Sequence, residues 1–149
     1  MRAITLIILH CSATRCNASY NFEQCRYDHI HHRGWKDIGY HYYVERDGSL
    51  HQGRPEAVVG AHCKGHNRHS IGVCYEGGLD ASGHACDTRT PAQKATLLAL
   101  IKDLHHRYPQ TIVVGHRDLS PDLNGNGLVE PLEWIKQCPC FDATEFSAL

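Results

Sequence analysis

The chain has 149 residues, which is the size of one domain that buries a single hydrophobic core. Its hydrophobic content of 42% and charged content of 21% are ordinary for a globular protein. The formal net charge of -1 offers no electrostatic attraction for nucleic acid or an anionic membrane surface. We therefore expect neither a nucleic-acid partner nor insertion into a membrane.

The N-terminus and the eight cysteines bear on where the protein is made. An even number of cysteines in a small secreted protein would suggest disulfide bonds. However, the apolar run near the N-terminus is too short for an export signal, and no stretch approaches the roughly 20 apolar residues of a membrane span. We therefore predict synthesis in a reducing cytoplasm without a signal peptide, with most cysteines free and one available to a metal.

Three segments of the first half have the patterns of regular structure. Residues 3–9 (AITLIIL) form a continuous apolar, β-branched run, which is typical of a buried central strand. Residues 21–33 are predicted to form a helix. Residues 38–53 predict two short strands around an Asp47-Gly48 turn, which is a strong hairpin signal.

The second half contains the clearest helix, predicted over residues 91–107 between two strands at 70–78 and 111–116. Thr90 is a natural N-cap, Pro91 suits the first helical position, and one apolar face is predicted to hold Leu97, Leu98, Ile101 and Leu104. The order of elements predicts an α/β fold: a single domain over residues 1–149, with a mixed central β-sheet flanked by helices.

Two histidines stand at the ends of predicted buried strands, His10 after the first and His116 at the end of the last. Residues at neighbouring strand ends are held rigidly and converge at one edge of a sheet, which suits a metal site. Cys138 in the KQCPCFD segment is the leading candidate for a third ligand, because two imidazoles and one thiolate form a normal catalytic zinc set. The alternative is that each histidine merely caps its strand.

Six motifs follow one another along the chain in a specific order. They are ILHCSAT, GWKDIGYHYYVERDGSLHQGR, GAHCKGHNRHSIGVCYEGG, TPAQ, GHRD and KQCPCFD. This combination, which runs from His10 to Asp142, resembles the N-acetylmuramoyl-L-alanine amidases of the phage-lysozyme type, which are related to the peptidoglycan recognition proteins. The resemblance implies cleavage of peptidoglycan between the lactyl group of the sugar and the first L-alanine of the stem peptide.

The resemblance also implies roles for particular residues. His10, His116 and Cys138 match the zinc ligands of the family, and Tyr40 and Lys136 match its catalytic pair. Related recognition proteins without activity commonly lose the cysteine, so its presence favours an enzyme. Zinc lowers the pKa of bound water to about 7, and Lys136 would offer a positive charge to the tetrahedral oxyanion. Tyr40 would hydrogen-bond the attacking water or the scissile group, and the group that shuttles the proton stays open.

Other polar residues receive weaker assignments. By resemblance, the GAHCKGHN segment lines the substrate groove with His62, Lys64 and Asn67, and the alternative is a solvated polar loop. Cys140 is not expected to be a ligand, because a CxC pair on one zinc is less usual than CxxC spacing. A further set of histidines on predicted helices is expected to be merely exposed: His29, His31, His32, His105 and His106.

An insertion between GHRD and KQC departs from the short phage enzymes. Its sequence, DLNGNGLVEPLE, fits the calcium-loop pattern D-x-[DN]-x-[DN]-G-x₅-E at every fixed position. The predicted calcium ligands are Asp122, Asn124, Asn126, the carbonyl of Leu128, Glu130 and Glu133. The alternative is an Asn-Gly-rich turn that leads into a short helix.

These inferences together predict a monomeric, zinc-dependent amidase that acts on peptidoglycan, with Ca²⁺ as a further cofactor. We interpret it as a phage or prophage lysin that reaches the cell wall after release from the cytoplasm. One alternative is a cytosolic amidase that recycles released muropeptides, although recycling enzymes of this fold usually carry Asp where this chain has Cys138. The other alternative is a module that binds peptidoglycan without cutting it.

Overall fold

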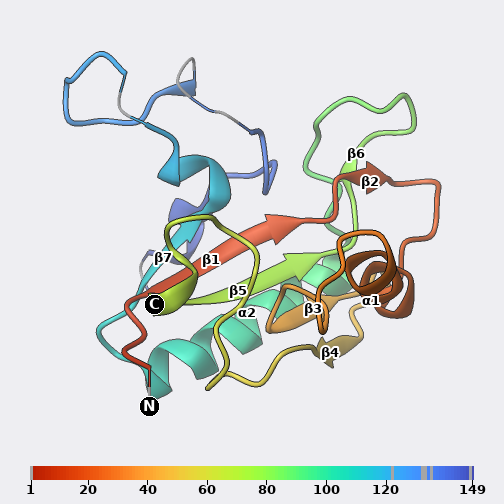
Figure 1. Cartoon of the computed structure of the whole chain (residues 1–149). Coiled ribbons are helices and arrows are strands. Elements are labelled where there is room, and N and C mark those ends of the chain that lie inside the picture. Colours follow the sequence, from red (N-terminus) through yellow and green to blue (C-terminus); the bar gives the residue numbers. More distant parts are fainter. Residues whose placement is uncertain (1, 122, 132–133, 135, 148) are drawn as a thin grey trace.

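A five-stranded mixed sheet forms the centre of the protein in the computed structural model, which describes residues 2–121, 123–131, 134, 136–147 and 149. The strand order is β4-β3-β5-β1-β7 (Figure 1). The strands span Leu6–Cys11 (β1), Tyr42–Val44 (β3), Leu50–Gln52 (β4), Ser70–Tyr75 (β5) and Ile112–Gly115 (β7). The predicted α/β fold with a mixed central sheet is confirmed.

The parallel strands β1 and β5 form the buried middle of this sheet. They run in register from Leu6 opposite Ser70 to Cys11 opposite Tyr75, and β5 is buried along its whole length. The side chains of both strands are buried on both faces of the sheet, as is typical of the apolar central strands of a parallel sheet. The strand predicted over residues 3–9 begins and ends later, so that His10 lies within it.

The edges of the sheet differ from its centre. β3 and β4 form the antiparallel hairpin predicted from the sequence, and Gly48 in its turn has a positive φ of 90°, which glycine adopts without strain. At the other edge β7 pairs with β1 alone. The prediction that β7 is fully buried is wrong, because Ile112 is 64% exposed. A small second sheet of β2 (Thr14–Arg15) and β6 (Gly78–Leu79) was not predicted.

The long helix α2 (Pro91–Arg107) packs along one face of the sheet (Figure 1). Thr90 caps it, as predicted, in a capping box with Gln93. Its buried apolar side chains are Leu97, Leu100, Ile101 and Leu104. Leu98, which was expected on this face, is 40% exposed. The buried residues follow the spacing i, i+3, i+4, i+7 from Leu97, and Leu98 lies to one side of that stripe.

The opposite face of the sheet is covered in part by helix α1 (Phe22–His31), which ends two residues earlier than predicted. Its side chains Phe22 and Cys25 pack against Tyr43 of β3 and Cys74 of β5. Successive residues of a strand point to opposite faces, so Cys74 faces α1 while its neighbours on β5 face α2. His10 lies opposite Cys74 in the register and therefore points away from α2.

The described residues of the C-terminal part include two short 3-10 helices, η2 (His116–Leu119) and η4 (Ala143–Phe146), and a further one, η1 (Asn67–His69), precedes β5. The side chains of Phe141 and Phe146 join the core beneath α2. The segment around residue 125 projects from the body of the molecule (Figure 1). Among the described residues, no helix is long and apolar enough to cross a membrane.

Candidate active site

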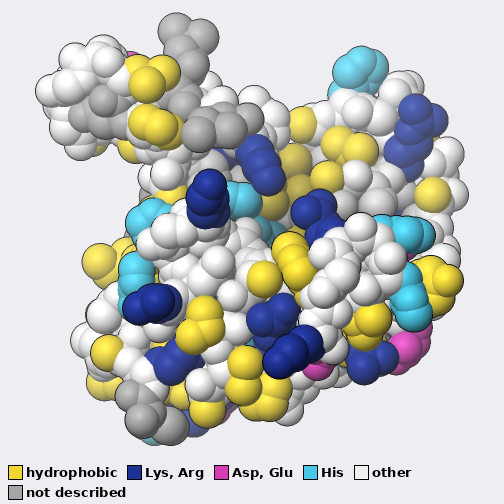
Figure 2. Space-filling model, viewed as in Figure 1, with side chains coloured by type: hydrophobic (Ala, Val, Ile, Leu, Met, Phe, Trp, Pro, Cys, Tyr) yellow, Lys and Arg dark blue, Asp and Glu magenta, His cyan; other side chains and the backbone are white. Residues whose placement is uncertain are grey.

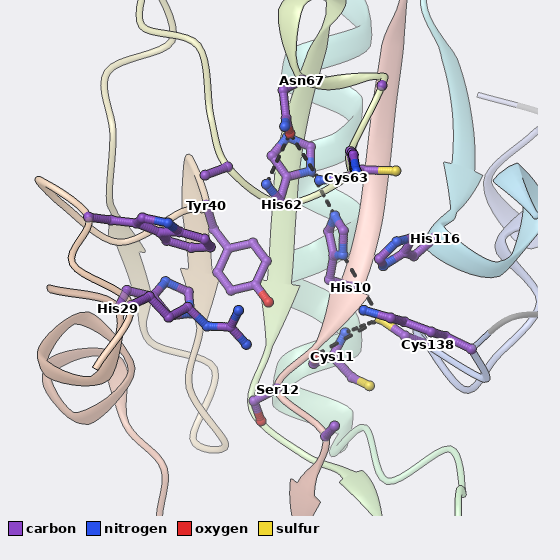
Figure 3. Close-up of a pocket in the computed structure, with 17 residues that line it drawn as sticks. His10, Cys11, Ser12, His29, Tyr40, His62, Cys63, Asn67, His116 and Cys138 are labelled. Carbon is purple, nitrogen blue, oxygen red and sulfur yellow. Dashed lines mark hydrogen bonds between the residues drawn. The ribbon is translucent and has the colours of Figure 1, made fainter. Parts of the chain in front are cut away.

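The structure brings together the three residues predicted to bind zinc (Figure 3). His10 comes from β1, His116 begins η2 directly after β7, and Cys138 comes from the C-terminal segment. One ligand atom of each, a ring nitrogen or the sulfur, lies within 4.8 Å of the other two. Because β1 and β7 are parallel neighbours, their carboxyl ends meet at one edge of the sheet, as the sequence predicted.

The donors of this cluster fit a zinc ion. Burial lowers the pKa of His10 well below its usual range, with further lowering from His62, His116 and Lys136, so its imidazole is neutral. Its Nδ1 lies 3.9 Å from the sulfur of Cys138. Tetrahedral zinc with bonds of about 2.0–2.3 Å holds its ligand atoms roughly 3.3–3.6 Å apart, so small shifts suffice. The backbone N–H of Cys11 donates to the Cys138 sulfur over 3.2 Å, which holds the sulfur beside β1.

Contacts with the core set the position of Cys138, whose described neighbours in the chain form no strand. The backbone N–H of Arg117 donates to the carbonyl of Cys138 over 2.8 Å. The hydroxyl of Tyr75, on the central strand β5, donates to the carbonyl of Pro139 over 2.7 Å. Further along, the guanidinium of Arg89 lies 3.4 Å from the ring centre of Phe141. These contacts join the segment to the core on both sides of the cysteine.

A cavity of about 430 Å³ opens above the cluster. His10, His116 and Cys138 all contribute to its lining, and Tyr40 faces them from across the cavity in Figure 3. The described lining includes three cationic side chains and no Asp or Glu; the cations are Arg33, Lys64 and Lys136. Lys and Arg side chains are also widespread on the face in Figure 2, whereas Asp and Glu gather mainly at its lower right.

Tyr40 and Lys136, the predicted catalytic pair, line this cavity together. The ring of Tyr40 lies 5.2 Å from that of His10, centre to centre. Burial raises the pKa of the Tyr40 hydroxyl well above its usual range, and nearby Cys74 and Cys138 raise it further. The hydroxyl therefore keeps its proton at neutral pH and can donate a hydrogen bond. Lys136 is exposed two residues before the cluster cysteine.

The three predicted substrate contacts also line the cavity, but two of them are engaged within the protein. His62 points inward, and its Nδ1 lies 2.8 Å from Nε2 of His10. The side-chain oxygen of Asn67 accepts hydrogen bonds from the backbone N–H groups of His62 and Cys63, at 3.0 and 2.9 Å. Lys64 also lines the cavity, and its side chain is exposed to solvent there.

Sequence reasoning missed one wall of the cavity, formed by His29, Arg33 and Trp35. The expectation that His29 is merely exposed is wrong. Its Nδ1 accepts a hydrogen bond from the backbone N–H of Gly39 over 2.9 Å, and its ring lies 5.6 Å from that of Tyr40. Burial lowers the pKa of His29 to about 4. Its spacing of seven from buried Phe22 places it on the inner side of α1, and this signal was available in the sequence.

The other helical histidines largely follow expectation. His31, His32 and His106 are exposed, whereas His105 is half-buried, with its Nδ1 3.3 Å from the hydroxyl of Thr111. Cys140 lies outside the cluster, with its sulfur 3.8 Å from that of Cys11.

Four of the six predicted calcium ligands are described, whereas Asp122 and Glu133 lie outside the described residues. The side-chain oxygen of Asn124 accepts from the N–H of Asn126 over 3.1 Å, and that of Asn126 accepts from the N–H of Leu128 over 2.9 Å. Glu130 accepts from both asparagine amides. Within the described ranges, His10, His116 and Cys138 are the single set of His, Cys, Asp or Glu side chains gathered as for a metal. The calcium loop therefore stays a prediction.

Comparisons with known proteins agree with this geometry. A family model described as N-acetylmuramoyl-L-alanine amidase matches residues 1–131. An endolysin of Enterobacteria phage K11 is 37% identical over 134 residues, which cover 90% of this chain and 79% of the endolysin. An uncharacterized protein of Haemophilus influenzae is 50% identical over 96 residues, which cover 64% of this chain and 83% of that protein.

A solved structure extends the similarity to the whole fold. N-acetylmuramoyl-L-alanine amidase LysC from Clostridium intestinale superposes with a TM-score of 0.71 at 29% identity, covering 99% of this chain and 85% of that chain. The sequence match, the shared fold and the cluster of two histidines and a cysteine all point the same way. This chain belongs to the N-acetylmuramoyl-L-alanine amidase family.

Proposed function

We propose that this protein is a zinc-dependent hydrolase of the amide bond between N-acetylmuramic acid and L-alanine in peptidoglycan. The observation that carries the proposal is the cluster of His10, His116 and Cys138 at a cavity that also holds Tyr40 and Lys136. All five residues come from one chain, so a monomer suffices for activity.

The cluster would hold the metal through a ring nitrogen of each histidine and the sulfur of Cys138. When bound, zinc supplies Lewis acidity and brings the pKa of water to about 7. Tyr40, which stays protonated, donates a hydrogen bond to the substrate carbonyl or to the attacking water. Lys136 places a positive charge where the tetrahedral oxyanion forms, and an amide needs that stabilisation because its carbonyl is a poor electrophile.

The cavity favours an anionic substrate of peptide size. A volume of about 430 Å³ is within the usual range for ligand pockets, roughly 300–1,000 Å³. Three cations and no described carboxylate line it, so a peptide that carries free carboxylates is attracted and a cationic one is repelled. The stem peptide of peptidoglycan carries such carboxylates. We assign Lys64, at the outer wall, to the binding of this part of the substrate.

We favour a lytic role on the cell wall, after release from the cytoplasm, over recycling of muropeptides. Similarity to the phage K11 endolysin over 90% of the chain supports this choice. The cysteine at position 138 supports it as well, since the resemblance associates recycling enzymes with Asp at this place. A module that binds without cutting is disfavoured, because the cluster, Tyr40 and Lys136 are all present around one cavity.

The test is release of dye from labelled, purified cell walls by the zinc-loaded protein. We expect release to stop with a chelator and to return with added zinc, and we expect one new N-terminal alanine for each bond cut. His116→Ala should abolish both release and bound zinc while the fold survives. Wall binding without release would mean a recognition module, and new reducing ends in place of new N-terminal alanines would mean a glycosidase.

The insertion adds a finer proposal, one Ca²⁺ bound by residues 122–133. Its support is the complete match of the sequence to the calcium-loop pattern. Gly127 at the turn position has a positive φ of 85°, as a tight loop requires. The loop ends three residues before Lys136, so its closure would affect where the lysine lies.

A further inference from the structure

A series of hydrogen bonds runs from the zinc cluster into the body of the protein through His62. Figure 3 shows its first member, between His10 and His62. Nε2 of His10 lies 2.8 Å from Nδ1 of His62, and Nε2 of His62 lies 3.2 Å from the hydroxyl oxygen of Ser70. Ser70 is fully buried at the start of β5. Both ring nitrogens of His62 are thus engaged within the protein.

The direction of these bonds follows from the orientation of His10. Its Nδ1 faces the sulfur of Cys138 at 3.9 Å, so this nitrogen must present a lone pair if it is to bind a metal. A neutral imidazole then carries its proton on Nε2, which donates to Nδ1 of His62. His62 in turn carries its proton on Nε2, which donates to the oxygen of Ser70. This arrangement of protons satisfies every nitrogen of the two rings and leaves the Nδ1 lone pair of His10 for a metal, whereas the reversed arrangement would place a proton on that Nδ1.

The ring of His62 is also confined by shape. A Cβ added at Gly72 of β5 would lie 2.6 Å from Cγ and Cδ2 of His62, and one added at Gly60 would lie 2.7 Å from Cδ2. Both distances are too short for real atoms, so two glycines leave the space that this ring occupies. The backbone N–H of His62 is held by the side chain of Asn67 at 3.0 Å. The ring therefore has little freedom to turn toward a substrate.

We propose that His62 is a positioning residue that selects the Nε2-protonated form of His10 and turns its Nδ1 toward the metal, with Ser70 fixing His62 from behind. This inference rests on the proposed zinc function, and it replaces the role of substrate contact for His62. Partners of this kind orient metal-bound histidines, and their loss typically costs about 10–100-fold in metal affinity.

Zinc affinity is the first test, measured by competition with a chromogenic chelator. His62→Ala should weaken zinc binding by about 10–100-fold. His62→Asn places an amide oxygen near the position of Nδ1 and should restore most of the affinity, which a merely space-filling role would not predict. The control is His69→Ala, which removes a histidine from the same segment that takes no part in the hydrogen bonds from His10 to Ser70. This variant should bind zinc as the wild type does. Wild-type affinity in His62→Ala would overturn the proposal.

The proton on His10 is the second test, and it needs no metal. Long-range ¹H–¹⁵N spectra of the metal-free wild-type protein should show His10 protonated at Nε2, and Ser70→Ala should raise the population of the other form. Protonation at Nδ1 in the wild type would refute the proposal even if zinc binds. If His62→Ala fails to fold, this measurement and Ser70→Ala still decide. Failure of the wild type to bind zinc would instead refute the proposed function.

Discussion

Removing the hydroxyl oxygen of Tyr75 should weaken the zinc site although Tyr75 is not one of the three proposed ligands. The residue is 1% exposed on β5, and its hydroxyl donates to the carbonyl of Pro139 over 2.7 Å. Pro139 directly follows Cys138 and is itself buried. Tyr75→Phe keeps the ring that packs against Phe141 and deletes only this tie between the central strand and the cysteine.

The size of the effect follows from burial. A hydrogen bond between neutral groups contributes about 1 kcal/mol, and an acceptor left buried without a partner costs about 1–3 kcal/mol. For a chain of this size, each kcal/mol lowers the melting temperature by roughly 2–4 °C. If this whole loss of free energy falls on the placement of Cys138, the free energy of zinc binding weakens by the same amount. A loss of about 1–3 kcal/mol corresponds to an affinity that is about 5–150-fold lower.

The assay compares Tyr75→Phe with Tyr43→Phe, a matched control. Tyr43 is also fully buried, and its hydroxyl also donates to a backbone carbonyl, that of Tyr20, but it lies on the α1 side of the sheet. Both variants should lose similar thermal stability, and Tyr75→Phe alone should lose zinc affinity in a chelator competition. Equal zinc affinity in the two variants would show that the bond to Pro139 does not position the cysteine.

Three further predictions concern other parts of the molecule. Tyr40→Phe and Lys136→Ala should each retain one zinc and lose kcat, by about 10²–10³-fold for a lost oxyanion donor, and an effect on KM alone would contradict these roles. The hydrogen bond from Arg107, with those from Tyr108 and Tyr42, lowers the pKa of Glu56 to about 2. The ionised Glu56 therefore stabilises the folded state fully above the pKa of Glu in the unfolded chain, near 4.3, and this stabilisation is lost as the pH falls toward 2. In urea unfolding at decreasing pH, Glu56→Gln should lose less free energy of unfolding than the wild type does. Calcium should raise the melting temperature, and Glu130→Gln should reduce that shift. If calorimetry detects no heat of calcium binding, the segment is only a turn.

The elements that positioned the first two ligands were predictable because their signals are local. Residues 6–9, directly before His10, are all apolar, and such a run is stable only where both faces of a strand are covered. The capping box at Thr90 and the turn at Gly48 are likewise encoded within a few residues. Two parallel strands that end in histidine then meet at one edge by topology.

The features that escaped prediction depend on contacts between distant parts of the chain. The spacing of His29 from Phe22 indicates the inner side of α1, but its place in the cavity wall depends on the loop before β3, where Gly39 donates to its Nδ1. The inward direction of His62 depends on the space left by Gly72, ten residues later on another element. The exposure of Ile112 depends on β7 having no neighbour on its outer side. Pattern within one segment carries no information about such packing.

The cluster joins two parts of the molecule that are held in different ways. His10 belongs to a strand with hydrogen-bonded neighbours on both sides, so its backbone stays in place whether or not a metal is bound. Cys138 belongs to the C-terminal segment, which forms no strand in its described part and contacts the core through Tyr75, Arg117 and the rings of Phe141 and Phe146. A metal that binds both must favour the packed form of this segment, and by linkage the packing favours the metal equally. The aromatic anchors and the zinc ligands therefore stabilise one another, and a change at either should be measurable at the other.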